Sequence, residues 1–314
     1  MKRKTLITII LFLIGIVTSF SQIPSHLLQG AMNGNATMQW QVAKYYENGQ
    51  GVKKDTDEAI QWYKKSIAGG CNTASVHLAA LYESIGKRGD AYIYFMQYYT
   101  DVKESLEGKG KVDRIEPKLL ALSQYKIGEY KLYGFDGIEK DVKGSITFFR
   151  DAVSNNYGDF AYINLANAYL ETGDSAKALS YLVIAEDKYH SDVSKVKLAQ
   201  CYIKGIGCKK DYDKAYELLE SIANKGDNIA LLTIGNLFYS RDFGRHNYAT
   251  AFRWYSKLAE STNKIYKGTA LRKLSAMYRY GLGVKEDSSK AETLLREAAS
   301  YGDEDAKSLF DSKF

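Results

Sequence analysis

Apolar residues in this chain recur with the spacing of amphipathic helices, and the helices come in pairs. Leu198 and Ala199 followed by Tyr202 lie on one face of a helix, at positions i, i+1 and i+4. A second helix follows, whose apolar positions have the i, i+3, i+4, i+7, i+8 spacing: Ala215, Leu218, Leu219, Ile222 and Ala223. This pattern predicts an all-α protein built from helix pairs.

A glycine-rich loop separates the two helices of a pair, and it recurs along the chain. Each copy has glycines, then an apolar residue, then an aspartate: Gly49, Gly51, Val52, Asp55; Gly134, Gly137, Ile138, Asp141; Gly205, Gly207, Cys208, Asp211; and Gly281, Gly283, Val284, Asp287. The aspartates are 86, 70 and 76 residues apart, about twice the length of a helix-pair repeat, and a weaker unit fits inside each interval.

The chain therefore divides into about seven predicted units, 34–69, 70–99, 119–157, 158–190, 191–225, 226–262 and 263–301. A polar connection, 100–118, interrupts the series, and residues 302–314 form a predicted C-terminal capping helix.

Each recurring position has a physical role. The glycines supply the positive φ that ends a helix and turns the chain. The aspartates accept hydrogen bonds from unpaired backbone N–H groups at the start of the second helix. The apolar loop residues are expected to plug each loop into the interior. Small residues on the second helix let two helices approach closely: Ala59, Ala215 and Ala291, with Ser145 in the third unit.

These ordered glycine, apolar, aspartate and alanine positions resemble the Sel1-like repeat family, a relative of the tetratricopeptide repeat. The resemblance covers nearly all of the chain after residue 33 and implies antiparallel helix pairs stacked into a right-handed solenoid. The unit 158–190 has the shorter loop of a tetratricopeptide repeat. The unit 226–262 departs further, with Arg241 and Phe243 in place of glycines and Asn247 in place of aspartate.

The N-terminus has the order of a secretory signal peptide. Lys2, Arg3 and Lys4 precede an apolar stretch, 6–17, and Ser19 and Ser21 are the small residues of a cleavage site. We expect a signal peptide over 1–21, a short linker over 22–33, and export to the periplasm, with the cell surface or secretion as alternatives. An uncleaved signal anchor is the other interpretation. No second apolar stretch follows, so we expect no stable membrane insertion after cleavage.

Composition supports a helical globular chain and excludes several functional classes. The sequence has 2 prolines, residues that break helix interiors, and 45% hydrophobic and 25% charged residues. Its net charge is +6, and three of these positive charges leave with the predicted signal peptide. A chain this close to neutral is not expected to bind nucleic acid.

No residue pattern predicts catalysis, a cofactor or a metal. The paired glycines lack the preceding strand and third glycine of a dinucleotide loop. The histidines, His26, His77, His190 and His246, lack metal-ligand spacing. Cys201 and Cys208 are both expected to face inward, so either a disulfide or two buried thiols fits the sequence.

Tyrosine is unusually frequent, with 26 residues, and most of them occupy core positions of the repeats. Tyr92, Tyr98 and Tyr99 are the candidates for partner binding. Tyr98 and Tyr99 stand where other units carry small or aliphatic residues. Either the helix runs past residue 99 and the tyrosines cover an extra turn, or the stack opens and displays them to a partner.

The sequence predicts a non-catalytic scaffold or adaptor that binds another protein in the bacterial cell envelope. The partner itself has no signature in the sequence. The alternatives are a carbohydrate- or peptidoglycan-binding module that uses exposed aromatic side chains, and an envelope enzyme, which the sequence favours least.

Overall fold

The computed structural model describes residues 22–110, 112, 115–135 and 137–311, so the predicted signal peptide lies outside the described residues. Sixteen helices account for the regular structure of this part, apart from an isolated bridge between Phe135 and Ile138. The chain divides into two compact units, residues 1–164 and 165–314. The all-α prediction is confirmed.

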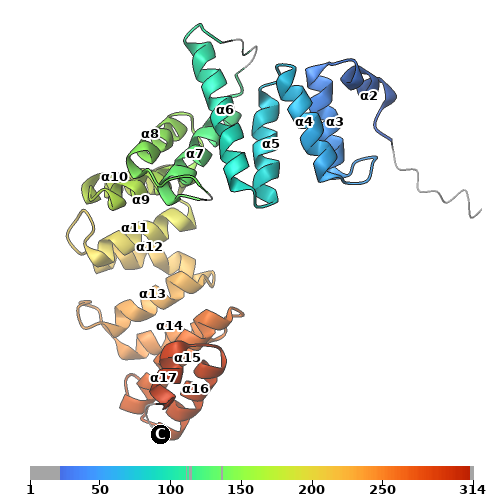
Figure 1. Ribbon diagram of the computed structural model, residues 1–314. Helices are drawn as coiled ribbons and strands as arrows, with labels where there is room; N and C mark the ends of the chain where they lie inside the picture. The colour runs from blue at the N-terminus through green and yellow to red at the C-terminus, as the bar shows by residue number, and fades with distance from the viewer. Residues whose placement is uncertain (1–21, 111, 113–114, 136, 312–314) are drawn as a thin grey trace, which may run out of the picture. The chain divides into compact units, whose positions relative to one another are not determined.

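In the first unit, seven helices follow one another and each packs on the next (Figure 1). They are α2 (Ser25–Met32), α3 (Ala36–Asn48), α4 (Thr56–Ala68), α5 (Thr73–Ser84), α6 (Arg88–Leu106), α7 (Pro117–Tyr133) and α8 (Val142–Ser154). The linker predicted over 22–33 is wrong, because most of it is α2, which packs on α3. Leu27 and Ala31 are buried in that contact, so this short helix covers the open end of the first pair.

The second unit repeats the same arrangement of paired helices. Its helices are α10 (Ser175–Tyr189), α11 (Asp192–Lys204), α12 (Tyr212–Asn224), α13 (Asn228–Tyr239), α14 (Tyr248–Ala259), α15 (Lys264–Tyr280), α16 (Ser288–Ser300) and α17 (Glu304–Asp311). The division between the units falls inside α9 (Asp159–Glu171). The described part of the predicted capping helix is α17, whose Ala306 is fully buried.

The predicted aspartates begin the second helix of four pairs. In each, a backbone N–H three residues later donates to the aspartate Oδ1, at 3.0 Å for Asp55, 2.8 Å for Asp141, 3.0 Å for Asp211 and 2.9 Å for Asp287. Asn247 does the same for α14, accepting from the Thr250 N–H at 2.9 Å. The exceptional loop of residues 240–247 therefore keeps the cap even though it lacks the aspartate.

The predicted loop glycines have positive φ throughout. Two of them also sit where one pair meets the previous one: a Cβ on Gly207 would collide with the Ser175 carbonyl oxygen, and one on Gly283 with the backbone of Tyr248 and Ala249. Glycine is needed at both for space as well as for conformation. The positive-φ set among the predicted positions is Gly49, Gly51, Gly134, Gly137, Gly205, Gly207, Gly281 and Gly283.

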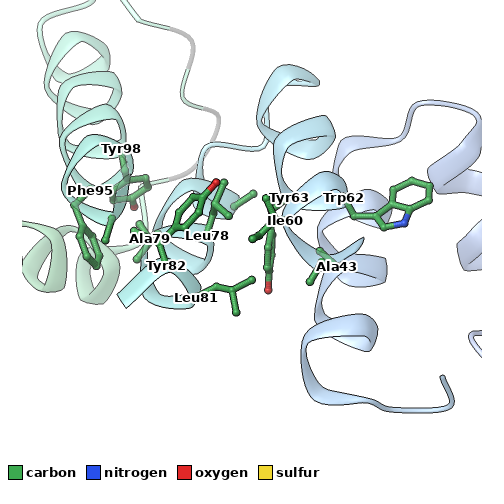
Figure 2. Close-up of a cluster of buried hydrophobic side chains, with 14 of the residues drawn as sticks. Ala43, Ile60, Trp62, Tyr63, Leu78, Ala79, Leu81, Tyr82, Phe95 and Tyr98 are labelled. Atoms are coloured by element: carbon green, nitrogen blue, oxygen red, sulfur yellow. The ribbon is translucent and has the colours of Figure 1, made fainter. Parts of the chain in front are cut away.

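Small residues oppose large ones in the interior. Ala59, Ala215 and Ala291 are fully buried, as predicted, and so is Ser145. Where the first helix of a pair must come closer still, it carries glycine: a Cβ on Gly128 would lie 2.8 Å from the Phe149 ring. Figure 2 shows the result in the first unit, where aromatic and aliphatic side chains of α4, α5 and α6 fill one continuous core.

Apolar loop residues contribute unequally to the interior. Phe243, in the exceptional loop, is 1% exposed and packs edge-on against Phe238 with ring centroids 5.3 Å apart. Val52, Ile138 and Val284 are only half-buried at the edge of the core. Cys208 is also half-buried, and both it and the buried Cys201 are free thiols. Of the two alternatives left by the sequence, the structure therefore has free thiols at Cys201 and Cys208 and no disulfide between them.

Candidate functional site

Helix α6 carries the three tyrosines predicted to bind a partner. Its inward face is defined by residues at i, i+4, i+7 and i+11, all fully buried: Ala91, Phe95, Tyr98 and Val102. Tyr98 thus belongs to the core face, whereas Tyr92 and Tyr99 lie on its flanks and are half-buried.

Tyr98 is not displayed to a partner, and that part of the prediction is corrected. Figure 2 shows its ring on α6 in the same buried cluster as Phe95 of α6 and Ala79 of α5. Helix α6 continues to Leu106, and Val112 and Ile115 of the following connection pack against the same core. The Tyr98 hydroxyl reaches the Glu116 carbonyl oxygen at 3.4 Å, and burial raises its pKa. Residues up to Leu106 are therefore helix, and Val112 and Ile115 cover part of the core in which Tyr98 is buried.

Tyr99 and Tyr92 each rest on an aromatic ring of the next pair. The Tyr99 ring meets Phe148 of α8 at a centroid distance of 5.1 Å and an interplanar angle of 65°. The Tyr92 ring meets Tyr130 of α7 at 5.8 Å and 75°. Both are edge-to-face contacts, which stabilise the junction between α6 and the next pair. Partner binding by Tyr92 and Tyr99 stays a prediction.

A groove of about 590 Å³ runs beside Tyr92, between α6 and the loop that joins α7 to α8. We call it the α6 groove and define it by Gly89, Tyr92, Ile93, Lys131, and residues 137–141. Ile93 is 60% exposed on its wall, beside Tyr92 and across from the charged residues of the loop. Lys140 and Glu139 give the rim charges of both signs. The lining thus combines apolar side chains with charged ones, and protein interfaces also contain both.

The loop that forms one wall of the groove is held firmly. The Phe135 and Ile138 backbones exchange hydrogen bonds of 3.2 and 2.6 Å, and the Arg88 guanidinium lies over the Phe135 ring at 4.7 Å. Asp141 caps α8 and also accepts from the Lys131 ammonium at 2.9 Å. The Gly144 N–H and then Lys131 stabilise its charged form, which lowers the Asp141 pKa. A partner would meet a groove that is already formed.

Four residues of the groove were singled out from the sequence: Tyr92 as a partner-binding candidate, and Gly137, Ile138 and Asp141 as positions of the repeat loop. Ile93 gives the signal that could have found it: once Ala91, Phe95 and Tyr98 are assigned to the core face, residue 93 must point outward. Lys131, Glu139 and Lys140 gave no such signal, because the loop geometry that brings them beside α6 depends on the fold.

The part of the chain that the structure describes has neither a metal-binding cluster nor a membrane-spanning helix. Within them, no group of three or more His, Cys, Asp or Glu side chains is placed to hold a metal ion. Every described helix is too short or too polar to span a bilayer.

Solved structures of several bacterial proteins are similar to this chain. A Sel1 repeat protein from Oxalobacter formigenes aligns over 92% of this chain and 79% of its own, with a TM-score of 0.63 and 21% identity. The C-terminal part of a TPR repeat-containing protein from Cytophaga hutchinsonii aligns over 84% and 95%, with a TM-score of 0.57 and 17% identity. A protective antigen of uropathogenic Escherichia coli aligns over 90% and 65%, with a TM-score of 0.50 and 22% identity. These likenesses establish the helix-pair repeat fold.

The sequence itself matches the family model for the Sel1 repeat at 36–71, 121–157, 193–227, 234–263 and 268–303. These five segments together cover more than half of the chain, and they include the pair with the exceptional loop. The units predicted at 70–99 and 158–190 fall between the matched segments. Sel1 repeats form helical scaffolds that typically bind proteins and are generally non-catalytic. The chain belongs to the Sel1 repeat family.

Proposed function

We propose that the protein is a non-catalytic scaffold of the bacterial cell envelope that binds a protein partner in the α6 groove. The observation that carries the proposal is the exposed Ile93 beside Tyr92 in a preformed groove with a charged rim. Each Å² of apolar surface that is buried in a complex contributes about 25 cal/mol of binding free energy. Ile93 could therefore anchor an apolar residue of the partner.

Location in the envelope rests on the N-terminal sequence. Its basic start, apolar stretch and small residues have the order of a signal peptide that directs export. The periplasm is the proposed location, and the cell surface or secretion would follow from the same signal.

A direct test compares two classes of ligand for the purified mature protein. Immobilised protein is exposed in parallel to solubilised envelope proteins and to purified peptidoglycan, with Ile93→Glu as the variant. We expect the wild-type protein to retain a specific envelope protein and Ile93→Glu to lose it, while thermal unfolding of the two is alike because residue 93 lies outside the core.

The matched control is Met32→Glu, which alters an apolar side chain that is 70% exposed on α2, away from the groove. It should retain the partner. Retention of peptidoglycan but of no protein would instead support a polymer-binding module, and equal retention by Ile93→Glu would remove the groove from the proposal.

A further inference from the structure

A second, smaller pocket lies in the second unit, where the C-terminal turns of α13 and α15 meet. Its volume is about 210 Å³, and its lining is mainly apolar. Leu295 of α16 and Leu309 of α17 contribute to the lining, while Tyr239 and Tyr280, the last residues of α13 and α15, provide aromatic side chains. Tyr280 is 68% exposed, so one wall of this pocket is open to solvent.

Three cations line the same pocket, and of the three only Arg272 forms ion pairs with described residues. Arg272 donates from Nε to Asp303 at 2.8 Å and from a terminal nitrogen to Asp305 at 3.0 Å. Lys273 and Arg279 form no ion pair within the described part of the chain. The Lys273 ammonium instead lies 5.8 Å from the centre of the Tyr239 ring.

The environment of Lys273 is unfavourable for its charge. Burial is the main reason that the Lys273 pKa is lowered, and the positive charge of Arg272 adds to the effect. The carboxylates of Asp305 and Asp303 act in the opposite direction without restoring the ordinary value. A bound anion would supply the charge that Lys273 and Arg279 lack.

The lining also indicates what the rest of the ligand must be. A closed apolar cavity of about 150 Å³ can hold a benzene-sized molecule, so this pocket has room for one aromatic or leucine-sized side chain. The neutral hydroxyls of the lining are those of Tyr239, Tyr280 and Ser275, and the Ser275 hydroxyl already donates to the Ala291 carbonyl oxygen at 2.6 Å. Sugar hydroxyls would therefore find few partners, whereas an apolar side chain beside a carboxylate matches both the lining and the charge.

We infer that this pocket binds an acidic peptide segment, with an apolar or aromatic side chain between Tyr239 and Tyr280 and an adjacent carboxylate on Lys273 and Arg279. The inference rests on the scaffold function proposed above and assigns a chemical class of partner to a second site. Arg279 can make paired hydrogen bonds to a carboxylate, and Lys273 adds a point charge.

The test uses synthetic peptides and the mature chain. A fluorescein-labelled peptide with glutamate on both sides of a phenylalanine is titrated by fluorescence anisotropy, in parallel with the same peptide carrying glutamines. We expect the glutamate peptide to bind about tenfold more tightly, because hydrogen bonds to charged groups are the stronger ones. Arg279→Gln should weaken its binding by about the same factor.

Lys264→Gln is the matched control, because it removes an exposed positive charge from the same helix outside the pocket. It should leave peptide affinity unchanged. Equal binding of the two peptides, or equal weakening by Lys264→Gln and Arg279→Gln, would overturn the proposal, as would tighter Arg279-dependent binding of polygalacturonate. Failure here would not affect partner capture in the α6 groove, which involves other residues and another ligand.

Discussion

Two glycines of one loop offer a direct measurement of how consecutive helix pairs are held together. Gly281 and Gly283 both have left-handed backbone conformations, with φ of +63° and +71°. Their surroundings differ: the nearest atom to a Cβ on Gly281 is 3.7 Å away, an ordinary contact, whereas a Cβ on Gly283 would collide with the backbone of Tyr248 and Ala249. Gly281→Ala therefore measures backbone strain alone, whereas Gly283→Ala measures the same strain together with the contact between helix pairs.

The expected magnitudes follow from these two effects. A non-glycine residue in the left-handed conformation costs about 1–2 kcal/mol, which is the whole effect expected for Gly281→Ala. Gly283→Ala adds a collision with the first turn of α14, which its cap on Asn247 holds in place. Overpacking of that kind costs about 1–3 kcal/mol more. Gly283→Ala should therefore lower the free energy of unfolding by roughly 2–5 kcal/mol.

Urea denaturation followed by circular dichroism measures both variants. Because the stability of repeat proteins is the sum of individual units and their interfaces, loss of one interface should also broaden the transition of Gly283→Ala. The pair Gly205→Ala and Gly207→Ala repeats the test, since only Gly207 contacts the previous pair, at Ser175 and Leu179. Equal midpoints for Gly281→Ala and Gly283→Ala would refute the close approach of the pairs.

The remaining predictions concern the caps, the core tyrosine and the thiols. The pKa values of Asp141, Asp174 and Asp211 are lowered, so their stabilisation is present above the unfolded pKa of about 3.9 and is lost as the pH falls through the lower folded values. In Asp211→Asn the asparagine can still cap the helix but does not titrate. The variant should therefore lose less free energy of unfolding than the wild-type protein between about pH 5 and 2. The same loss in both proteins would contradict this. Tyr98→Ala should lower the free energy of unfolding by about 3–5 kcal/mol in the same urea assay, because the ring is buried. Tyr98→Phe should lower it by less than about 1 kcal/mol, because the hydroxyl contact is long. A small effect of Tyr98→Ala would contradict the burial of this side chain. Three thiols should react with a disulfide reagent after unfolding, and Cys201 should react slowly in the native protein because burial raises its pKa; two missing thiols would reveal a Cys201–Cys208 bridge.

Local chemistry explains why much of the fold could be predicted. An aspartate before an amphipathic helix caps it whatever surrounds it, and a glycine that needs positive φ marks its loop, so Asp211 and Gly207 indicate their structure from sequence alone. The same chemistry holds in the exceptional loop, where Asn247 replaces aspartate as the cap and Phe243 fills the core.

Features that depend on tertiary packing could not be predicted in the same way. Tyr98 violates the small-residue pattern of its position, and only the longer α6 and the packing of Val112 and Ile115 on the same core show how it is buried. The linker prediction failed because α2 is stabilised by burial of Leu27 and Ala31 on α3, which the repeat pattern does not describe. The α6 groove and the pocket lined by Arg272, Lys273 and Arg279 also combine residues that are distant in sequence.

Site-specific photo-crosslinking tests the central claim, that this repeat protein recognises a protein partner in the α6 groove. A photoreactive amino acid replaces Ile93 in one variant and Met32 in another, two exposed apolar positions of the first unit. Both variants are exposed to envelope extract, and the crosslinked products are identified by mass spectrometry. The account predicts one protein joined at position 93 and none at position 32. Crosslinks at position 32 with none at position 93 would contradict it.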